Sequence, residues 1–191
     1  FKKIIRKKVD VIIGGPPCQA YSTSGKRLLD DKRAHLYHEY YRSLKELRPS
    51  IFLYENVRGL LSMNNGKLFI ELKKLFSSLG YKISAKVLNA ADYGVPQLRQ
   101  RVIIVGTLGN RKFEYPEPTH NDNEKNLDLF DDKKKYLTLQ DAISDLPFLE
   151  NGGETKKYLS KPKNEYQKKL RDNNKEIEDH KAPSHGTNLM K

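Results

Sequence analysis

The stretch Val9-Asp10-Val11-Ile12-Ile13-Gly14-Gly15-Pro16-Pro17-Cys18-Gln19 decides the fold expected for this chain. Its first five residues are β-branched and nearly all apolar, which predicts a strand buried on both faces, as in a parallel sheet. Two glycines and two prolines then end the strand in a stiff turn, because glycine permits unusual backbone angles and proline fixes φ. Open α/β sheets place ligands at the carboxyl ends of their strands. The only cysteine, Cys18, therefore lies where chemistry is expected, although an unpaired cysteine can equally be a small core residue.

A second strand is expected after one helix. Apolar side chains recur at helical spacing over residues 34–48 and a proline follows, which predicts a helix that ends there. Residues 51–54 form another short apolar run, so the pattern is strand, helix, strand. Such a βαβ unit makes the two strands parallel neighbours. Cys18 and Glu55, which follow these strands, are therefore expected at the same edge of the sheet.

Two more strands complete the predicted sheet. A helix is expected over residues 67–79, with a glycine at its C-cap, and strands over 81–88 and 102–105. The connection between the last two strands is too short for a helical crossover, so they should be antiparallel. The final strand then begins at the edge where the parallel strands end. That topology brings Arg99 and Arg101 to the edge that holds the cysteine and the glutamate.

Charge and composition divide the chain into two regions. Residues 1–110 hold 20 Lys and Arg against 8 Asp and Glu, whereas residues 111–191 hold 16 of each, so the whole net charge of +12 lies in the first region. A basic field suits a polyanionic partner such as DNA or RNA, although a lysine-rich solvated surface gives the same composition. The second region contains one short capped helix, expected over 138–146, and residues 151–191 are too polar to form a core of their own.

Several classes of protein are excluded or disfavoured. One cysteine rules out an intramolecular disulfide and a cysteine-rich metal site, and it fits a reducing bacterial cytoplasm or nucleoid. The five histidines lack the spacing of metal ligands, so no metal is expected. There is neither a signal peptide nor an apolar run long enough for a membrane span. Because the first residue is Phe1 rather than Met, we expect a piece of a longer protein.

A thiol, a carboxyl group and two guanidiniums at one sheet edge suit nucleophilic attack on an electron-poor ring. A thiolate that adds to carbon 6 of cytosine makes carbon 5 able to accept a methyl group, and nearby arginine lowers the pKa of a cysteine. Burial raises the pKa of a glutamate, so Glu55 could carry a proton to the ring nitrogen N3. The base must leave the double helix to reach such a pocket. The alternative is a structural ion pair that caps the strand ends.

Three motifs resemble signatures of the DNA (cytosine-5)-methyltransferases in both order and separation. They are Gly14-Gly15-Pro16-Pro17-Cys18-Gln19-Ala20-Tyr21-Ser22, Glu55-Asn56-Val57 and Gln97-Leu98-Arg99-Gln100-Arg101. Residues 87–96 also resemble the family's lead-in to the last motif. The resemblance is strong over residues 9–109 and weaker beyond them, where the chain is similar to the start of the family's variable target-recognition region.

The resemblance implies catalytic roles for four residues and a substrate-binding role for Asn56. Cys18 would be the nucleophile, and Glu55 would hydrogen-bond N3 and the exocyclic amine of cytosine. Asn56 would fix the loop that holds Glu55. Arg101 would bind the cytosine carbonyl and Glu55, whereas Arg99 would lie near the nucleophile and the DNA backbone.

The resemblance also implies binding residues. Pro17 would back the pocket for cofactor and target base, and Leu36 would pack on the cofactor, S-adenosylmethionine. Gln19, Ser22 and Gly25 would belong to a polar loop over residues 21–33 that closes on DNA. The expected architecture is therefore α/β: the catalytic half of a Rossmann-like methyltransferase sheet (1–110), then a linker and an irregular partial target-recognition region (111–191).

The sequence departs from the family in one important respect. It contains neither the glycine-rich cofactor loop and ribose-binding acid that the family places before its first catalytic motif, nor the C-terminal motifs. We therefore expect an incomplete site that binds S-adenosylmethionine weakly or not at all, and a fragment that is inactive alone. The strand over residues 9–13 would have one bare edge, which invites self-association.

The function implied is a DNA cytosine-5 methyltransferase of the restriction-modification type, with double-stranded DNA as its partner. Two alternatives stay open at this point. One is the branch of the family that methylates cytosine in tRNA with the same motifs. The other is a non-catalytic nucleic-acid-binding relative, which loss of the cysteine or the glutamate would indicate, and both are present.

Overall fold

The structure is a computed structural model that describes residues 8–17, 36–109, 111–122 and 132–186. The chain forms two compact units. The first unit comprises Phe1–Asn89 and Arg99–Pro118, and the second unit comprises Ala90–Leu98 and Thr119–Lys191. The division expected from composition, at residue 110, stays a prediction.

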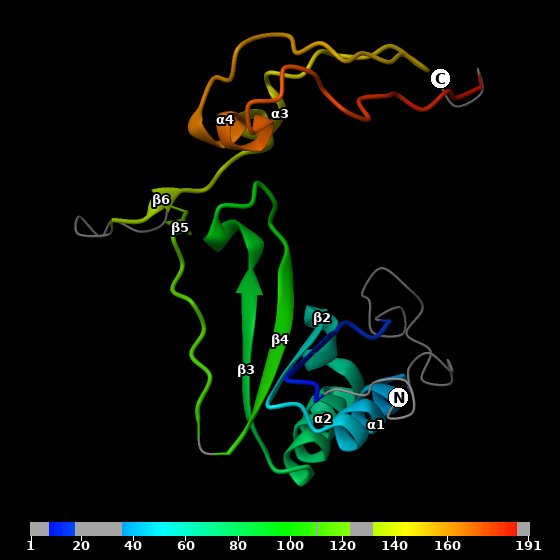
Figure 1. Cartoon of the computed structure of the whole chain (residues 1–191), viewed down its shortest axis with the longest axis vertical. Coiled ribbons are helices and arrows are strands. Elements are labelled where there is room, and N and C mark those ends of the chain that lie inside the picture. The colour runs from blue at the N-terminus through cyan, green and yellow to red at the C-terminus, as the bar shows by residue number, and fades with distance from the viewer. Residues whose placement is uncertain (1–7, 18–35, 110, 123–131, 187–191) are drawn as a thin grey trace. The chain divides into compact units, whose positions relative to one another are not determined.

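A four-stranded sheet in the order β1-β2-β4-β3 forms the first unit (Figure 1). Its strands are β1 (Val11–Gly14), β2 (Ile51–Val57), β3 (Tyr81–Asn89) and β4 (Gln100–Leu108). β1 and β2 are parallel and are joined through α1 (Tyr37–Leu47), whereas β4 runs antiparallel to both β2 and β3. The structure thus confirms the predicted βαβ unit and the antiparallel final strand.

The apolar core lies between one face of this sheet and the helices α1 and α2 (Lys67–Ser78). Alternate residues of β2 point into it, which is the period of a strand with one covered face. The fully buried ring of Phe52 packs edge-on against Phe76, at 5.1 Å between ring centroids, and against Tyr81, at 5.0 Å. Gly106 lies beneath that ring: a Cβ added there would be 2.1 Å from it.

Two short 3₁₀ segments, η2 (Arg58–Leu61) and η3 (Met63–Gly66), connect β2 to α2. After α2, Gly80 has φ of +83° and its N–H donates to the Ser77 carbonyl oxygen at 2.8 Å. Glycine adopts this left-handed conformation without steric cost, so the predicted helix C-cap is confirmed.

The prediction that the first strand is buried on both faces is wrong. Val11 and Ile13 are 51% and 73% exposed. The physical reason is position, because β1 is an edge strand of this sheet and the core covers only the face on which Ile12 and Gly14 lie. Within the described residues no strand pairs with its outer side, so the predicted bare edge is present.

Two strand boundaries also differ from prediction. β2 continues through Glu55 and Asn56 to Val57 instead of ending at residue 54, and β4 begins at Gln100 rather than at residue 102. The additional residues of the two strands pair with each other, since Glu55 pairs with Ile103 and Val57 with Arg101. Glu55, which was expected on a loop at the end of this strand, therefore lies within a paired strand.

The second unit is built from small elements. These are η4 (Ala90–Tyr93), β5 (His120–Asn121), β6 (Lys134–Lys135), α3 (Leu139–Ile143) and α4 (Glu165–Arg171). α3 confirms the predicted capped helix over part of its expected length: Thr138 and Asp141 form a reciprocal capping box. No helix in the described part of the chain is long and apolar enough to cross a membrane.

Candidate active site

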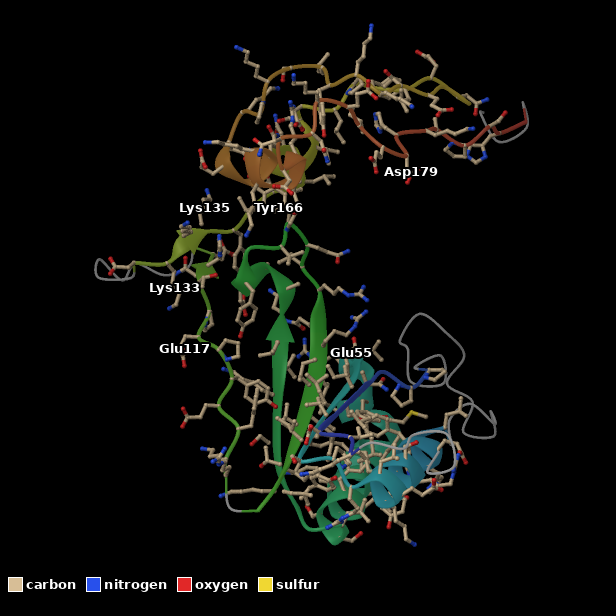
Figure 2. The ribbon with its side chains drawn as sticks, in the orientation of Figure 1. Glu55, Glu117, Lys133, Lys135, Tyr166 and Asp179 are labelled. Carbon is tan, nitrogen blue, oxygen red and sulfur yellow. The ribbon has the colours of Figure 1, made fainter. Side chains whose placement is uncertain are left out.

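The ion pair between Glu55 and Arg101 forms the centre of the candidate site. Glu55 Oε1 lies 2.8 Å from Arg101 Nε, and the two side chains are 39% and 24% exposed. Both residues point to the sheet face opposite the core, since Arg101 pairs with Val57, two residues beyond Glu55 on β2. Figure 2 labels Glu55 at the end of β2. Topology predicted that both residues lie at one edge of the sheet, and the family resemblance implied their contact; the carboxyl group is half-buried rather than fully buried.

The glutamate also packs against the turn that leads to Cys18. A Cβ added at Gly15 would lie 3.0 Å from Glu55 Oε2 and 3.6 Å from the Glu55 carbonyl oxygen. A side chain at residue 15 would therefore displace the carboxylate. Glycine is therefore required at position 15 because the Glu55 carboxylate packs closely against the backbone there. The sequence alone did not predict this contact.

Asn56 ties the same turn to β2. Its side chain is 1% exposed, and its Nδ2 donates to the Pro16 carbonyl oxygen at 3.3 Å. Its Oδ1 accepts from the Val57 N–H at 2.9 Å, so both ends of the amide are used. A buried amide with satisfied hydrogen bonds fixes the relative position of two segments. Asn56 thus holds the Gly-Gly-Pro-Pro turn beside the carboxylate.

A second tie across the site was missed by sequence reasoning. Arg58 Nη1, at the start of η2, donates to Gln100 Oε1 at 2.8 Å, and Arg101 Nη1 donates to the Gln100 carbonyl oxygen at 2.9 Å. The Arg58–Gln100 bond joins the segment after β2 to the start of β4, whereas the Arg101–Gln100 bond lies within β4. The only available signal was adjacency: Arg58 follows the Glu-Asn-Val motif and Gln100 stands between the two motif arginines.

The other predicted site residues are not joined to this cluster by the contacts of the described residues. Arg99 is exposed, and its backbone N–H donates to Asn89 Oδ1 at 3.0 Å. Pro17 is exposed, whereas Leu36 is half-buried at the start of α1. Several predicted positions lie outside the described residues: Cys18, Gln19, Ser22, Gly25 and the loop over 21–33.

The arrangement has a definite chemical capacity. A carboxyl group can exchange a proton with a ring nitrogen and accept a hydrogen bond from an amine, whereas a guanidinium offers fixed N–H donors to a carbonyl or phosphate oxygen. The N3, amine and carbonyl groups of cytosine form a complementary edge. Because Glu55 Oε1 already binds Arg101, one partner orients the other before a ligand arrives.

The fold and this site define a methyltransferase-like α/β protein. The structure resembles the crystal structure of an E. coli prophage protein described as a DNA modification methyltransferase, with a TM-score of 0.61 and 28% identity over 88% of this chain and 46% of that one. The chain also matches the family described as C-5 cytosine-specific DNA methylase over residues 2–191. It belongs to that family.

Curated relatives agree with this assignment. The chain is 42% identical to the type II methyltransferase M1.HphI of Haemophilus parahaemolyticus over 163 residues, which cover 84% of this chain and 40% of the relative. It is 38% identical to M.DdeI of Desulfomicrobium norvegicum over 193 residues, 98% of this chain and 45% of the relative. The chain thus spans less than half the length of these two relatives.

Proposed function

We propose that this chain supplies the catalytic part of a type II DNA (cytosine-5)-methyltransferase, which transfers a methyl group from S-adenosylmethionine to carbon 5 of a flipped cytosine. One observation carries the proposal: the Glu55–Arg101 ion pair packs against Gly15, in the turn that leads to Cys18. Family membership and relatives named as type II methyltransferases support it.

In this proposal, the thiolate of Cys18 attacks carbon 6 of cytosine while Glu55 transfers a proton to N3. Protonation of N3 prevents negative charge from building on the ring, and the resulting enamine makes carbon 5 nucleophilic. Carbon 5 then accepts the methyl group, which would come from S-adenosylmethionine and leave S-adenosylhomocysteine. A base removes the proton from carbon 5, Cys18 is eliminated as the thiolate, and N3 returns its proton to Glu55. Arg101 orients Glu55 and binds the cytosine carbonyl oxygen, whereas the exposed Arg99 binds the DNA backbone.

S-adenosylmethionine would supply the methyl group. The half-buried apolar side chain of Leu36 and the exposed ring of Pro17 fit the contacts of an apolar and aromatic cofactor surface. We propose that this chain alone binds the cofactor weakly or not at all, since the family's glycine-rich loop is absent from the sequence. Calorimetric titration should show no micromolar binding; a micromolar dissociation constant would contradict this.

The bare edge of β1 is proposed to pair with another chain, in the simplest case a second copy. Its support is the unpaired outer side of β1 among the described residues, with the exposed apolar side chains of Val11 and Ile13 beside it. Light scattering at high concentration should report association. A strictly monomeric chain would contradict it.

Methyl transfer tests the roles of Glu55 and of DNA. A chimeric enzyme in which this chain replaces the aligned residues of M1.HphI should methylate duplex DNA and not tRNA. Glu55→Gln should slow transfer about a hundredfold or more, because it removes the proton donor. Glu39→Gln, which changes an exposed acid on α1, is the control and should change the rate less than about twofold. Methylation of tRNA in place of DNA, or a near-normal rate with Glu55→Gln, would contradict the proposal.

A further inference from the structure

Tyr40 lies on α1 with its ring in the apolar core, and its hydroxyl group reaches the two strands that lead to the candidate site. The hydroxyl group donates to the Leu53 carbonyl oxygen of β2 at 2.8 Å and to the Ile12 carbonyl oxygen of β1 at 3.3 Å. The residue is 8% exposed. One buried side chain of the helix therefore binds both parallel strands at once.

The two carbonyl groups lie along the seam between β1 and β2. Directly before β1, Asp10 accepts a hydrogen bond from the Ile51 N–H at 3.1 Å, so the backbone groups of these two residues face the seam. Alternate residues of a strand face the same side, which places the Ile12 and Leu53 carbonyl groups there too. A slip of one strand along the other would therefore change both distances from the Tyr40 hydroxyl group.

β1 is weakly held in other respects. It comprises four residues, it pairs with β2 alone among the strands that the structure describes, and its outward-facing Ile13 is 73% exposed. A short edge strand gains few ladder hydrogen bonds and little apolar burial, so additional contacts are needed to fix its position. The hydrogen bonds of Tyr40 are contacts of this kind.

The ring of Tyr40 also contacts the last residue of β1. A Cβ added at Gly14 would be 2.6 Å from Tyr40 Cε2, so the ring packs directly on the backbone where the turn begins. The same ring packs edge-on against Tyr54, at 5.3 Å between ring centroids, and the Tyr54 hydroxyl oxygen accepts from Asn56 Nδ2 at 3.4 Å. Asn56 in turn binds Pro16. Tyr40 and Asn56 thus hold successive parts of one turn.

The Tyr40 hydroxyl group stays protonated over the working pH range of a protein. Burial raises the pKa of Tyr40 well above its ordinary value, and the neighbouring Tyr54 and Tyr81 add to this shift. A neutral phenol donates a hydrogen bond to a carbonyl oxygen, whereas a phenolate could only accept one. The contact between helix and strands is therefore independent of pH.

From this arrangement we infer that Tyr40 is a positioning residue, whose hydroxyl group fixes β1 along β2 and thereby holds Gly15 against the Glu55 carboxylate. The clearance is small, since a Cβ at Gly15 would already be 3.0 Å from Glu55 Oε2. The inference rests on the proposed function, because that function makes the spacing between turn and carboxylate important for catalysis. A misplacement of about 1 Å can cost an enzyme about a hundredfold in rate.

Hydrogen exchange in the full chain tests the contact without a catalytic assay. Tyr40→Phe keeps the ring and removes only the hydroxyl group. Exchange of the Gly14 and Gly15 amides should then accelerate about tenfold, which corresponds to the loss of about one hydrogen bond. NMR follows each of these amides separately.

Tyr81→Phe is the matched control. Tyr81 belongs to the same core, is 3% exposed, and its hydroxyl group also donates to a backbone carbonyl oxygen, that of Pro49, at 2.7 Å. Pro49 precedes β2, so this bond lies at the opposite end of the strand from Glu55. The control should accelerate exchange of the two glycine amides less than about twofold. Wild-type exchange in Tyr40→Phe, or equal acceleration in the control, would overturn the inference.

Methyl transfer separates positioning from stability. In the M1.HphI chimera, Tyr40→Phe should lower kcat about tenfold and change KM for DNA less than about twofold, because a buried hydroxyl group does not contact DNA. Tyr81→Phe should change neither constant. An unchanged kcat in Tyr40→Phe, or an equal loss of kcat in both variants, would overturn the positioning role.

These outcomes are distinguishable from failure of the proposed function. Methyl transfer that depends on Glu55 but not on Tyr40 would leave the proposed function standing and overturn this inference. A chimera that does not methylate DNA at all would instead overturn the proposed function and the positioning role together, whereas faster exchange in Tyr40→Phe would still establish the contact between α1 and the two strands.

Discussion

The two units of this protein are stabilised in different ways. In the first unit, aromatic and aliphatic side chains of β2, β4, α1 and α2 form one apolar cluster. In the second unit, the buried side chains include Asp145 and Gln167, and ion pairs and amide hydrogen bonds hold the short helices. The comparison teaches that apolar periodicity predicts the first kind of structure, whereas long-range polar contacts determine the second.

The largest effect is expected in the apolar cluster. Phe52→Ala should destabilise the first unit by about 4 kcal/mol, because it removes a fully buried ring and leaves a cavity above Gly106. Denaturant unfolding measures the change. Ile70→Ala, at an exposed position of α2, is the control and should cost less than about 1 kcal/mol. Similar costs for both would mean that the cluster does not dominate the stability of this unit.

A smaller and more local effect is expected in the second unit. Arg171 Nε donates to Asp145 Oδ2 at 2.9 Å, and the two side chains are 13% and 4% exposed. Asp145→Ala leaves a buried guanidinium unpaired, so it should cost about 3 kcal/mol locally. Hydrogen exchange should accelerate in α3 and α4 and stay unchanged in the sheet.

The exposed pair of Glu154 and Lys181 provides the comparison for this buried pair. Its members lie 3.5 Å apart with side chains more than half exposed, so Glu154→Ala should change exchange little. Faster hydrogen exchange throughout the sheet after Asp145→Ala would show that this buried ion pair does not stabilise the second unit alone, and would contradict the prediction.

The smallest effect is a pH dependence confined to the start of α3. Hydrogen bonds from the side chain and backbone of Thr138 lower the pKa of Asp141 below 3.8. A carboxyl group whose pKa is lower in the folded state stabilises that state fully above its unfolded pKa and loses the effect as pH falls through the folded value. Fraying of α3, followed by NMR, should therefore increase below about pH 4. This pH dependence should be smaller in Thr138→Ala, because that variant has lost the hydrogen bonds that lower the pKa of Asp141. An identical pH profile in that variant would contradict this.

Sequence reasoning predicted the features that depend on local patterns or on topology. The parallel pair of β1 and β2, the glycine C-cap after α2 and the Thr138 cap each have a short-range signal. Strand directions alone predicted that Glu55 and Arg101 share one edge of the sheet, whereas their contact was implied by the family resemblance. Exposure of Val11 and Ile13 was missed, because an apolar run does not reveal whether a neighbouring strand and covering layer are present.

The missed features of the site depend on contacts between distant residues. Arg58 bonds to Gln100 across 42 positions, and neither residue has a pattern that identifies the other as its partner. The polar braces of α3 and α4 are similar, since Gln167 reaches Asp141 across 26 positions. Such hydrogen bonds depend on the folded geometry, and no periodic pattern of residues in the sequence predicts them.

The most direct test of the central claim is covalent trapping by duplex DNA that contains 5-fluorocytosine. Fluorine at carbon 5 replaces the proton that must leave, so the enzyme should stay bonded to carbon 6. With S-adenosylmethionine, the M1.HphI chimera should form a denaturant-resistant adduct, which mass spectrometry should locate at residue 18. Cys18→Ser should abolish it. An adduct that persists in Cys18→Ser, or that maps to another residue, would contradict the assignment of the nucleophile beside Glu55 and Arg101.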